Sequence, residues 1–316
     1  MRLYITRPMP PDVAARACAA FQCDIRDSQQ PLDRDEMVHA LRTYDIVLPT
    51  LGDAFSAGIF AEVAAPRCRL LANFGVGYNH IDVDAARAAG LAVSNTPGAV
   101  TDATADIAMT LILMSARRAG EGERLVRAGR WQGWNPTQLL GLHVTGRTVG
   151  IVGMGRIGQA VARRCHFGFG MKVRYHSRSA KTLEFPAEAA NSLADLAAAV
   201  DFLVIAVPGG AETHHLIGRD VLAAMRPQAH LVNISRGNVV DEAALIDALS
   251  QEQIVGAGLD VYEFEPQVPQ ALIDMENVVL LPHLGTAALD VRTAMGMMAL
   301  DNAAAFAAGD PLPNPV

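Results

Sequence analysis

The feature that most constrains this chain is a glycine-rich turn near its middle. Gly153-Met-Gly155-Arg-Ile-Gly158 directly follows the apolar segment Val149-Gly-Ile-Val152 and opens a segment with helical periodicity. Such a motif is informative only between a strand and a helix, and both are expected here. The first glycine permits a tight turn, the second lets a pyrophosphate approach the backbone, and the third lets helix and strand pack closely. The sequence therefore predicts a dinucleotide-binding site.

Short apolar segments alternate with helical patterns along most of the chain, which predicts parallel sheets covered on both faces. Before the glycine turn we expect strands at residues 3–6, 45–48, 70–73 and 92–94, with helices at 12–21, 82–89 and 101–118. A loop with some helix follows at 121–146. After it we expect six strands, at 148–152, 172–175, 202–207, 231–234, 257–260 and 278–281, and a last helix at 287–308. This is the pattern of doubly wound α/β domains.

Composition excludes several classes of protein. The 316 residues are enough for about two domains, and a hydrophobic fraction of 51% supports a large core. The net charge is -7 and no Lys/Arg run is present, so nucleic acid is not an expected partner. No run of 18 apolar residues predicts a membrane span, and no signal peptide is recognisable. The four cysteines lack C-x-x-C or zinc spacing, which favours the cytoplasm and no metal site.

The end of the second strand after the glycine turn indicates which dinucleotide binds. An NAD site usually carries an acidic residue there, about 20 residues after the motif, to bind the ribose 2′-hydroxyl. This chain instead has Tyr175-His-Ser-Arg-Ser179. An arginine can bind a 2′-phosphate bidentately, and serine hydroxyls can add hydrogen bonds. We therefore predict NADP(H), with NAD(H) possible, bound mainly by Ser177 and Arg178 and also by Ser179. The alternative is that Arg178 is only a solvated surface residue.

Charged and titratable residues follow three successive predicted strands at the edge where doubly wound sheets bind ligands. They are Arg236, Asp260 with Glu265 five residues later, and His283. Reduction of a 2-oxo acid needs a proton donor, for which histidine is suited, and a cation that binds the carboxylate. A carboxylate beside the histidine would orient the ring and stabilise its charged form. Individually these residues could be structural, but together they predict this chemistry.

Residues from about 70 to 315 closely resemble the D-isomer-specific 2-hydroxyacid dehydrogenases, and most of all the glyoxylate/hydroxypyruvate reductases among them. The resemblance rests on the order and spacing of several motifs. Besides the glycine turn these are Asn73-Phe-Gly-Val-Gly77, Asn95-Thr-Pro-Gly98, Thr101-Asp-Ala-Thr104, Asn233-Ile-Ser-Arg-Gly237, Gly258-Leu-Asp-Val261, Glu265-Pro266 and Pro282-His-Leu-Gly-Thr286. Residues 1–69 match only in their pattern.

The resemblance implies a role for each matching site residue. Arg236, Glu265 and His283 would form the catalytic set. The backbone N–H groups of Val76 and Gly77 would bind the substrate carboxylate, with Leu51 near the pocket. The cofactor contacts would come from the glycine turn and neighbouring loops: Thr104, Gly153, Gly155, Arg156, Ile157, Gly158, Val207, Pro208, Thr213, Ile234, Ser235, Asp260, His283 and Gly285.

The resemblance also implies a domain division and an assembly. A discontinuous, flavodoxin-like substrate domain would comprise residues 1–98 and 287–316, and the dinucleotide-binding domain would comprise residues 99–286, with the cleft between them. Relatives are usually homodimers that associate through the cofactor domain and the loop after the long helix. Trp131 and Trp134 lie in that loop, and Trp134 could enter the partner's pocket. Alternatively, both tryptophans only bury apolar surface at the interface.

The expected reaction is hydride transfer from NADPH to glyoxylate or hydroxypyruvate, giving glycolate or D-glycerate, with His283 as the proton donor. One alternative is the same chemistry on a bulkier acid such as 2-ketogluconate or a hydroxyphenylpyruvate. A second alternative is a dinucleotide-sensing scaffold like the corepressors built on this fold. The intact acid/base and carboxylate-binding residues argue against the scaffold.

Overall fold

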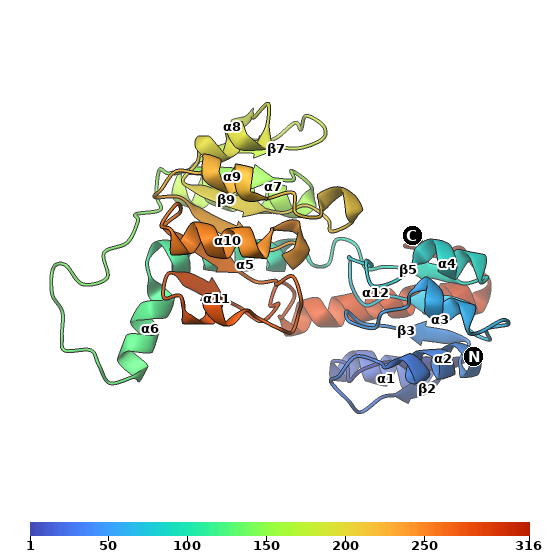
Figure 1. Cartoon of the computed structure of the whole chain (residues 1–316). Helices are drawn as coiled ribbons and strands as arrows, with labels where there is room; N and C mark the ends of the chain where they lie inside the picture. The colour runs from blue at the N-terminus through green and yellow to red at the C-terminus, as the bar shows by residue number, and fades with distance from the viewer. The chain divides into compact units, whose positions relative to one another are not determined.

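The computed structural model describes residues 1–316, which form two compact units. The first unit comprises Met1–Val100 and Ala287–Val316, and the second comprises Thr101–Thr286. The predicted divisions lie after residues 98 and 286, and the compact units divide after residues 100 and 286. Each unit contains its own sheet (Figure 1). No helix of either unit is long and apolar enough to cross a membrane.

The first unit is built on a five-stranded parallel sheet of order β2-β1-β3-β4-β5. Its strands are β1 (Arg2–Ile5), β2 (Gln22–Ile25), β3 (Ile46–Leu48), β4 (Leu70–Ala72) and β5 (Ala92–Ser94). Its helices are α1 (Pro11–Ala20), α2 (Arg34–Thr43), α3 (Ala57–Ala61), α4 (Val83–Ala88) and α12 (Leu289–Ala308). The sequence patterns do not predict β2, α2 or α3. The edge strand β2 is only half-buried, so it lacks the apolar run of a central strand.

Side-chain alternation along the strands divides the core of this unit into two layers. Leu3 and Ile5 point to the face covered by α1 and α12. Val47 and Leu71 point to the opposite face, which α2, α3 and α4 cover. The last helix of the chain therefore completes a core that the first strand begins.

The second unit contains a seven-stranded sheet of order β12-β11-β10-β9-β6-β7-β8, and every pair in it is parallel. The strands are β6 (Thr148–Val152), β7 (Lys172–His176), β8 (Ala187–Ala189), β9 (Phe202–Ile205), β10 (His230–Asn233), β11 (Gly256–Leu259) and β12 (Val278–Leu280). The prediction of six strands omits β8, because its three residues carry no apolar run and lie at the edge. The doubly wound parallel architecture is confirmed.

Helices cover both faces of this sheet. On one face, α5 and α7 pack against the sheet through buried residues such as Leu111 and Val161. On the other face, α8, α9 and α10 pack against the same sheet. The helices are α5 (Thr101–Ala116), α6 (Ala119–Arg127), α7 (Arg156–Phe169), α8 (Leu193–Ala198), α9 (Arg219–Ala224), α10 (Glu242–Ser250) and α11 (Gln270–Asp274), with short 3-10 helices η1 (Ala211–Thr213) and η2 (Gly237–Val239). The predicted helix 101–118 ends earlier, because Arg118 adopts a left-handed φ of 51° before α6.

Buried His230 should make the stability of the second unit pH-dependent. It lies at the start of β10, 4% exposed and stacked on Phe202, and burial lowers its pKa from 6.5 to about 4. Between pH 6.5 and 4, His230 is therefore protonated in the unfolded chain but stays neutral in the folded protein. The free energy of unfolding consequently falls as pH decreases through this range. The loss should approach about 3 kcal/mol below pH 4.

Urea unfolding of the wild type and His230→Leu at pH 7, 5.5 and 4.5 checks this prediction. The variant should have a flatter acid dependence, because its side chain cannot titrate. Equal slopes for the two proteins would show that other groups cause the acid sensitivity.

Candidate active site

The glycine turn between β6 and α7 has the shape that a pyrophosphate requires. Gly153 has a φ of 93°, and a Cβ there would lie 2.7 Å from the Ala206 carbonyl oxygen. A Cβ at Gly158 would lie 2.1 Å from the Gly153 carbonyl oxygen, so this glycine is needed for close packing. Gly155 instead faces open space, with nothing within 4 Å, and no side chain caps α7 there. The N–H groups of the first turn thus remain available to an anion, and the residues fit a bound dinucleotide.

The other predicted cofactor residues lie on loops at the same edge of the sheet. Arg156 and Ile157 begin α7, and Val207 and Pro208 follow β9, the strand beside β6. Thr213 donates a hydrogen bond from Oγ1 to the Pro208 carbonyl oxygen at 2.8 Å, which holds this loop. The strand order reverses around β6, so the loops lie at the switch point of the sheet, where nucleotides bind in this architecture.

A carboxylate from a distant segment accompanies the predicted 2′-phosphate residues. Ser177, Arg178 and Ser179 follow β7, and the Arg178 side chain is 90% exposed. Its Nη1 lies 3.6 Å from Oε2 of Glu212 in η1. The sequence did not predict Glu212, because this residue lies in η1, far along the chain from the segment that follows β7. The fold thus places an acidic group beside the predicted arginine.

Glu265 and His283 form a direct pair. His283 Nδ1 and Glu265 Oε2 are 2.8 Å apart, and Glu265 Oε1 accepts a hydrogen bond from the Tyr262 N–H at 3.1 Å. Burial acts to raise the pKa of Glu265, but the hydrogen bond and charge of His283, assisted by the Tyr262 N–H and Arg236, lower it below its ordinary value. Glu265 therefore stays an acceptor, which orients Nδ1–H toward it and leaves Nε2 as the ring atom available to a ligand.

Arg236 lies in the segment between β10 and η2, near this pair. Its Nη1 donates to the Ser235 carbonyl oxygen at 2.7 Å, while Asn233 Nδ2 donates to the Arg236 carbonyl oxygen at 3.0 Å. Burial lowers the pKa of Arg236, and the charge of Glu265 acts in the opposite direction. Gly237 packs so tightly that a Cβ would lie 1.8 Å from the Tyr262 carbonyl carbon. The segments carrying the guanidinium and the carboxylate are thus fixed against each other.

Asp260 organises the turn that carries His283. It is 1% exposed, and its two oxygens accept hydrogen bonds from the N–H groups of Leu284 at 2.6 Å and Gly285 at 2.8 Å. Burial raises the pKa of Asp260, and these two N–H groups oppose that shift. Thr104 Oγ1 donates to the Gly285 carbonyl oxygen at 3.0 Å. His283 itself has a φ of 53°, so the buried carboxylate stabilises a turn that few histidines adopt.

The predicted substrate residues Leu51, Val76 and Gly77 belong to the first unit. Asn95 Nδ2 donates to the Val76 carbonyl oxygen at 2.9 Å and Asn73 Nδ2 donates to that of Gly77 at 3.1 Å, which fixes both peptide planes. Leu51 is 40% exposed on the turn after β3. This turn is one of the loops at the carboxyl edge of the five-stranded sheet.

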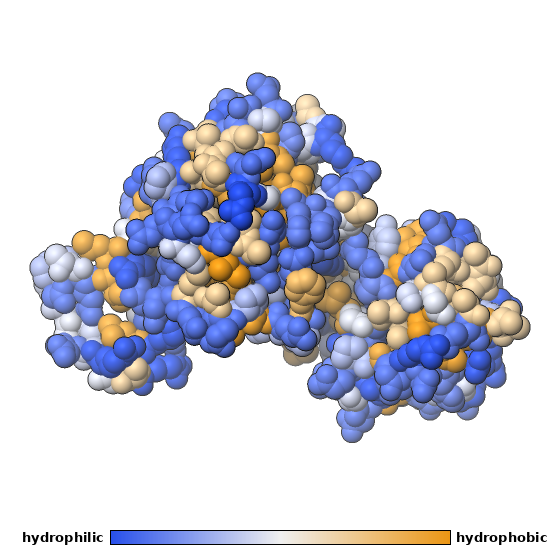
Figure 2. Space-filling view, in the orientation of Figure 1, coloured by the Kyte–Doolittle hydropathy of each residue, from blue (hydrophilic) through white to orange (hydrophobic).

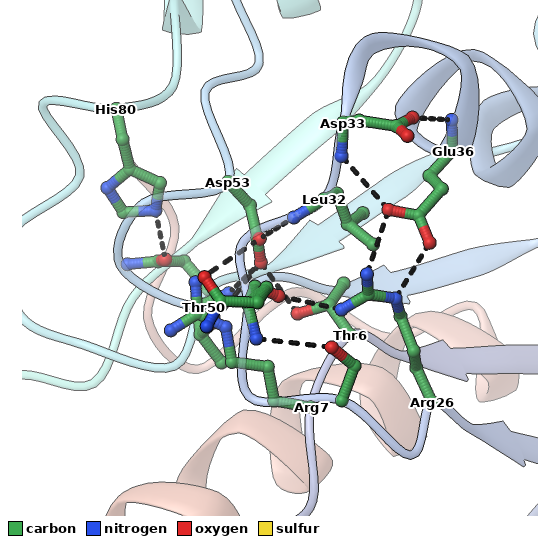
Figure 3. Close-up of polar contacts among 12 residues, drawn as sticks. Thr6, Arg7, Arg26, Leu32, Asp33, Glu36, Thr50, Asp53 and His80 are labelled. Carbon is green, nitrogen blue, oxygen red and sulfur yellow. Dashed lines mark hydrogen bonds and ion pairs between the residues drawn. The ribbon is translucent and has the colours of Figure 1, made fainter.

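A buried carboxylate holds the turn of Leu51 in place. Asp53, whose side chain has no exposed surface, accepts hydrogen bonds from Thr6 Oγ1 at 2.6 Å, the Thr50 N–H at 2.8 Å and the Leu32 N–H at 2.9 Å (Figure 3). Arg7 Nη2 lies 3.7 Å from Oδ1 of the same carboxylate. One side chain thereby connects the segments that follow β1, β2 and β3.

The two tryptophans lie in the loop after α6, which extends away from the rest of the second unit (Figure 1). Trp131 and Trp134 are 53% and 82% exposed, and Val126 and Leu140 nearby in sequence are also exposed. Hydrophobic side chains are visible on this projection in Figure 2. Within the chain, Trp134 is therefore far more exposed than is usual for its residue type.

Comparison with known proteins finds a matching family and similar sequences. A family model described as the NAD binding domain of D-isomer specific 2-hydroxyacid dehydrogenases matches residues 109–285. The glyoxylate reductase of Thermococcus kodakarensis is 42% identical, in an alignment that covers 98% of this chain and 94% of that relative. The glyoxylate reductase of Pyrococcus furiosus is 39% identical, with 98% of this chain and 93% of that relative covered.

Solved structures are similar over the whole chain. An NADPH-dependent glyoxylate/hydroxypyruvate reductase from Sinorhizobium meliloti, in complex with NADP and malonate, superposes with a TM-score of 0.88 at 36% identity, covering 100% of this chain and 96% of that one. The TT0316 protein from Thermus thermophilus gives a TM-score of 0.92 at 38% identity, with 100% of both chains covered.

Proposed function

This chain belongs to the D-isomer specific 2-hydroxyacid dehydrogenases, and we propose that it reduces glyoxylate and hydroxypyruvate to their 2-hydroxy acids with NADPH. The observation that carries the proposal is the grouping of Arg236, Glu265 and His283 at the sheet edge that also holds the glycine turn. Curated relatives named as glyoxylate reductases support the choice of substrate.

His283 is the proposed proton donor to the carbonyl oxygen. Its Nδ1 is bound to Glu265, so the proton that reaches the substrate comes from Nε2. Glu265 stabilises the protonated imidazole before transfer, because its negative charge lies at hydrogen-bond distance. A bound nicotinamide dinucleotide supplies the hydride that reduces the carbonyl carbon.

Arg236 is the proposed carboxylate-binding residue. A guanidinium fits a carboxylate bidentately and can also polarise the neighbouring carbonyl oxygen. Burial strengthens such contacts because little water competes for the charge. Val76 and Gly77 are proposed to add backbone N–H contacts to the same carboxylate, and Leu51 is proposed to line the pocket.

A substrate panel tests the proposal. kcat/KM should be measured for glyoxylate, hydroxypyruvate, pyruvate, phenylpyruvate and 2-ketogluconate, each with NADPH and with NADH. Glyoxylate and hydroxypyruvate should give the highest values. Activity confined to the bulkier acids would reject the proposed substrate but not the chemistry. No turnover of any acid would instead favour a dinucleotide-binding scaffold.

Arg178 is proposed to favour NADPH by binding the 2′-phosphate. Arg178→Ala should lower kcat/KM for NADPH by about tenfold or more, since it removes a charge-assisted contact, and should change the value for NADH little. Arg163→Ala, which removes another exposed arginine from the same unit, serves as the control. An equal loss of kcat/KM with both cofactors would show that Arg178 does not distinguish them by binding the 2′-phosphate.

Glu212 should weaken the same preference. Its carboxylate lies beside Arg178 and would repel a 2′-phosphate, so Glu212→Gln should raise kcat/KM for NADPH by roughly fivefold or less, because solvent screens exposed charges. The gain should shrink at high salt. Unchanged kinetics at low salt would mean that the carboxylate moves away when the cofactor binds.

We also propose a homodimer. The exposed apolar side chains of α6 and its following loop support it, because burying Trp131, Trp134 and Leu140 against a second copy would remove apolar surface from water. Trp134 is proposed to contact substrate in the partner's pocket. Analytical ultracentrifugation measures the assembly, and a Trp134→Ala variant that stays dimeric but has a raised KM would support the pocket contact.

A further inference from the structure

Two imidazoles and a carboxylate form a separate cluster in the second unit. His214 and His215 follow η1 in the loop after β9, and Glu263 lies in the loop after β11. One potential ligand atom from each lies within 4.8 Å of the other two. We propose that these three side chains form a binding site for a transition-metal ion, with Zn²⁺ as its ligand.

Two of the three ligands already face each other. His215 Nε2 and Glu263 Oε1 are 2.8 Å apart, and the Glu263 side chain is only 13% exposed. Backbone contacts anchor both residues: the His215 N–H donates to the Asn238 carbonyl oxygen at 2.8 Å, and the Glu263 N–H donates to Glu242 Oε2 at 3.3 Å. A metal ion would take the place of the proton that the imidazole and the carboxylate now share.

His214 provides the third ligand from the solvent side. Its ring stacks on His215 with 4.0 Å between centroids and 26° between planes. Zinc binds imidazole nitrogen at about 2.1 Å, so two ligands of a tetrahedral site lie roughly 3.4 Å apart. The His215 Nε2–Glu263 Oε1 separation of 2.8 Å is shorter than this distance, and the three ligand atoms all lie within 4.8 Å of one another, so these atoms would have to shift slightly around an ion. Because His214 is exposed, a side-chain rotation can bring its nitrogen to the ion at little packing cost, and water would complete the coordination.

The surrounding charges favour a cation. Glu242 contacts Glu263, because its Oε2 accepts a hydrogen bond from the Glu263 N–H at 3.3 Å, so two carboxyl-bearing residues lie close together here. An ion at Glu263 would offset this proximity of two carboxyl groups. The mixed imidazole and carboxylate donors suit zinc better than magnesium or calcium, which bind oxygen ligands. None of the three residues belongs to the proposed catalytic set, and Zn²⁺ binding can be measured without substrate.

Calorimetric titration of the untagged, EDTA-treated protein with ZnCl₂ tests the site. The wild type should bind one Zn²⁺ per chain, and His214→Ala should weaken binding by at least tenfold. His143→Ala, which removes another exposed histidine of the same unit, should bind as the wild type does. Titration with CoCl₂ should give the visible absorption of tetrahedral cobalt in the wild type and not in His214→Ala.

Three results would overturn the proposal. They are the absence of saturable Zn²⁺ binding by the wild type, a loss of less than tenfold in His214→Ala, and an equal loss in His143→Ala. His214 is exposed and outside the proposed catalytic set, so circular dichroism should confirm that the variant is folded and that altered binding reflects the lost ligand.

Discussion

Replacement of His283 by alanine should lower kcat for glyoxylate reduction by about 10²-fold to 10⁴-fold, the range that positioned proton transfer contributes in enzymes. The side chain is paired with Glu265 and partly exposed, so its removal leaves no large cavity. Binding of the dinucleotide, measured by fluorescence titration, should change much less than kcat. A large loss of kcat with little change in dinucleotide binding would indicate that His283 acts in the chemical step rather than in maintaining the structure.

Glu265→Gln provides the second arm of this experiment. Glutamine keeps a hydrogen-bond acceptor but removes the negative charge beside the ring, so kcat should fall while dinucleotide binding changes little. His143→Ala should match the wild type throughout. If kcat survives in His283→Ala, the proton comes from another group, and the proposed catalytic set is wrong.

The largest loss of stability should come from Asp53→Ala in the first unit. Its carboxylate is fully buried and accepts four hydrogen bonds at 2.6–3.2 Å, beside the guanidinium of Arg7. Removing one member of a buried charged network leaves the other members without a partner, which typically costs about 3–5 kcal/mol. Asp84→Ala is the matched control, because that carboxylate is 95% exposed and its ion pair should contribute about 0.5 kcal/mol or less.

Hydrogen exchange should be read separately for each unit, because a two-unit protein need not unfold in one step. Backbone amides of β1 and β3 should lose protection in Asp53→Ala, while those of β9 and β10 should keep it. A global free energy of unfolding within about 1 kcal/mol of the wild type, with normal protection in β1, would show that water replaces the carboxylate at this site.

Sequence reasoning succeeded where a signal is local. The strand, glycine turn and helix around Gly153 are contiguous, so their pattern sufficed to predict the turn. Arg236 and His283 each follow a strand of the same sheet, and parallel strands place their carboxyl ends at one edge, so their proximity could be inferred from order alone. The family and the two-sheet fold are confirmed.

Most of the missed features depend on tertiary contacts. The exposed strand β8 is stabilised by pairing with β7 rather than by apolar residues of its own. The helix α2 did carry a readable signal, the capping box of Asp33 and Glu36. The hydrogen bonds of Asp260 to the turn after His283 could not be predicted, because strand order places the two loops together without specifying which polar atoms meet.

The position of α12 in the first unit has a consequence for biosynthesis. Ala299, Leu300 and Ala303 from this last helix pack in the same layer as Leu3 and Ile5 from the first strand. A ribosome therefore releases the whole second unit before it has made the helix that completes the first. The usual amino-terminal-first order of domain folding should be reversed here, because the first hundred residues cannot complete their core until α12 has been synthesised.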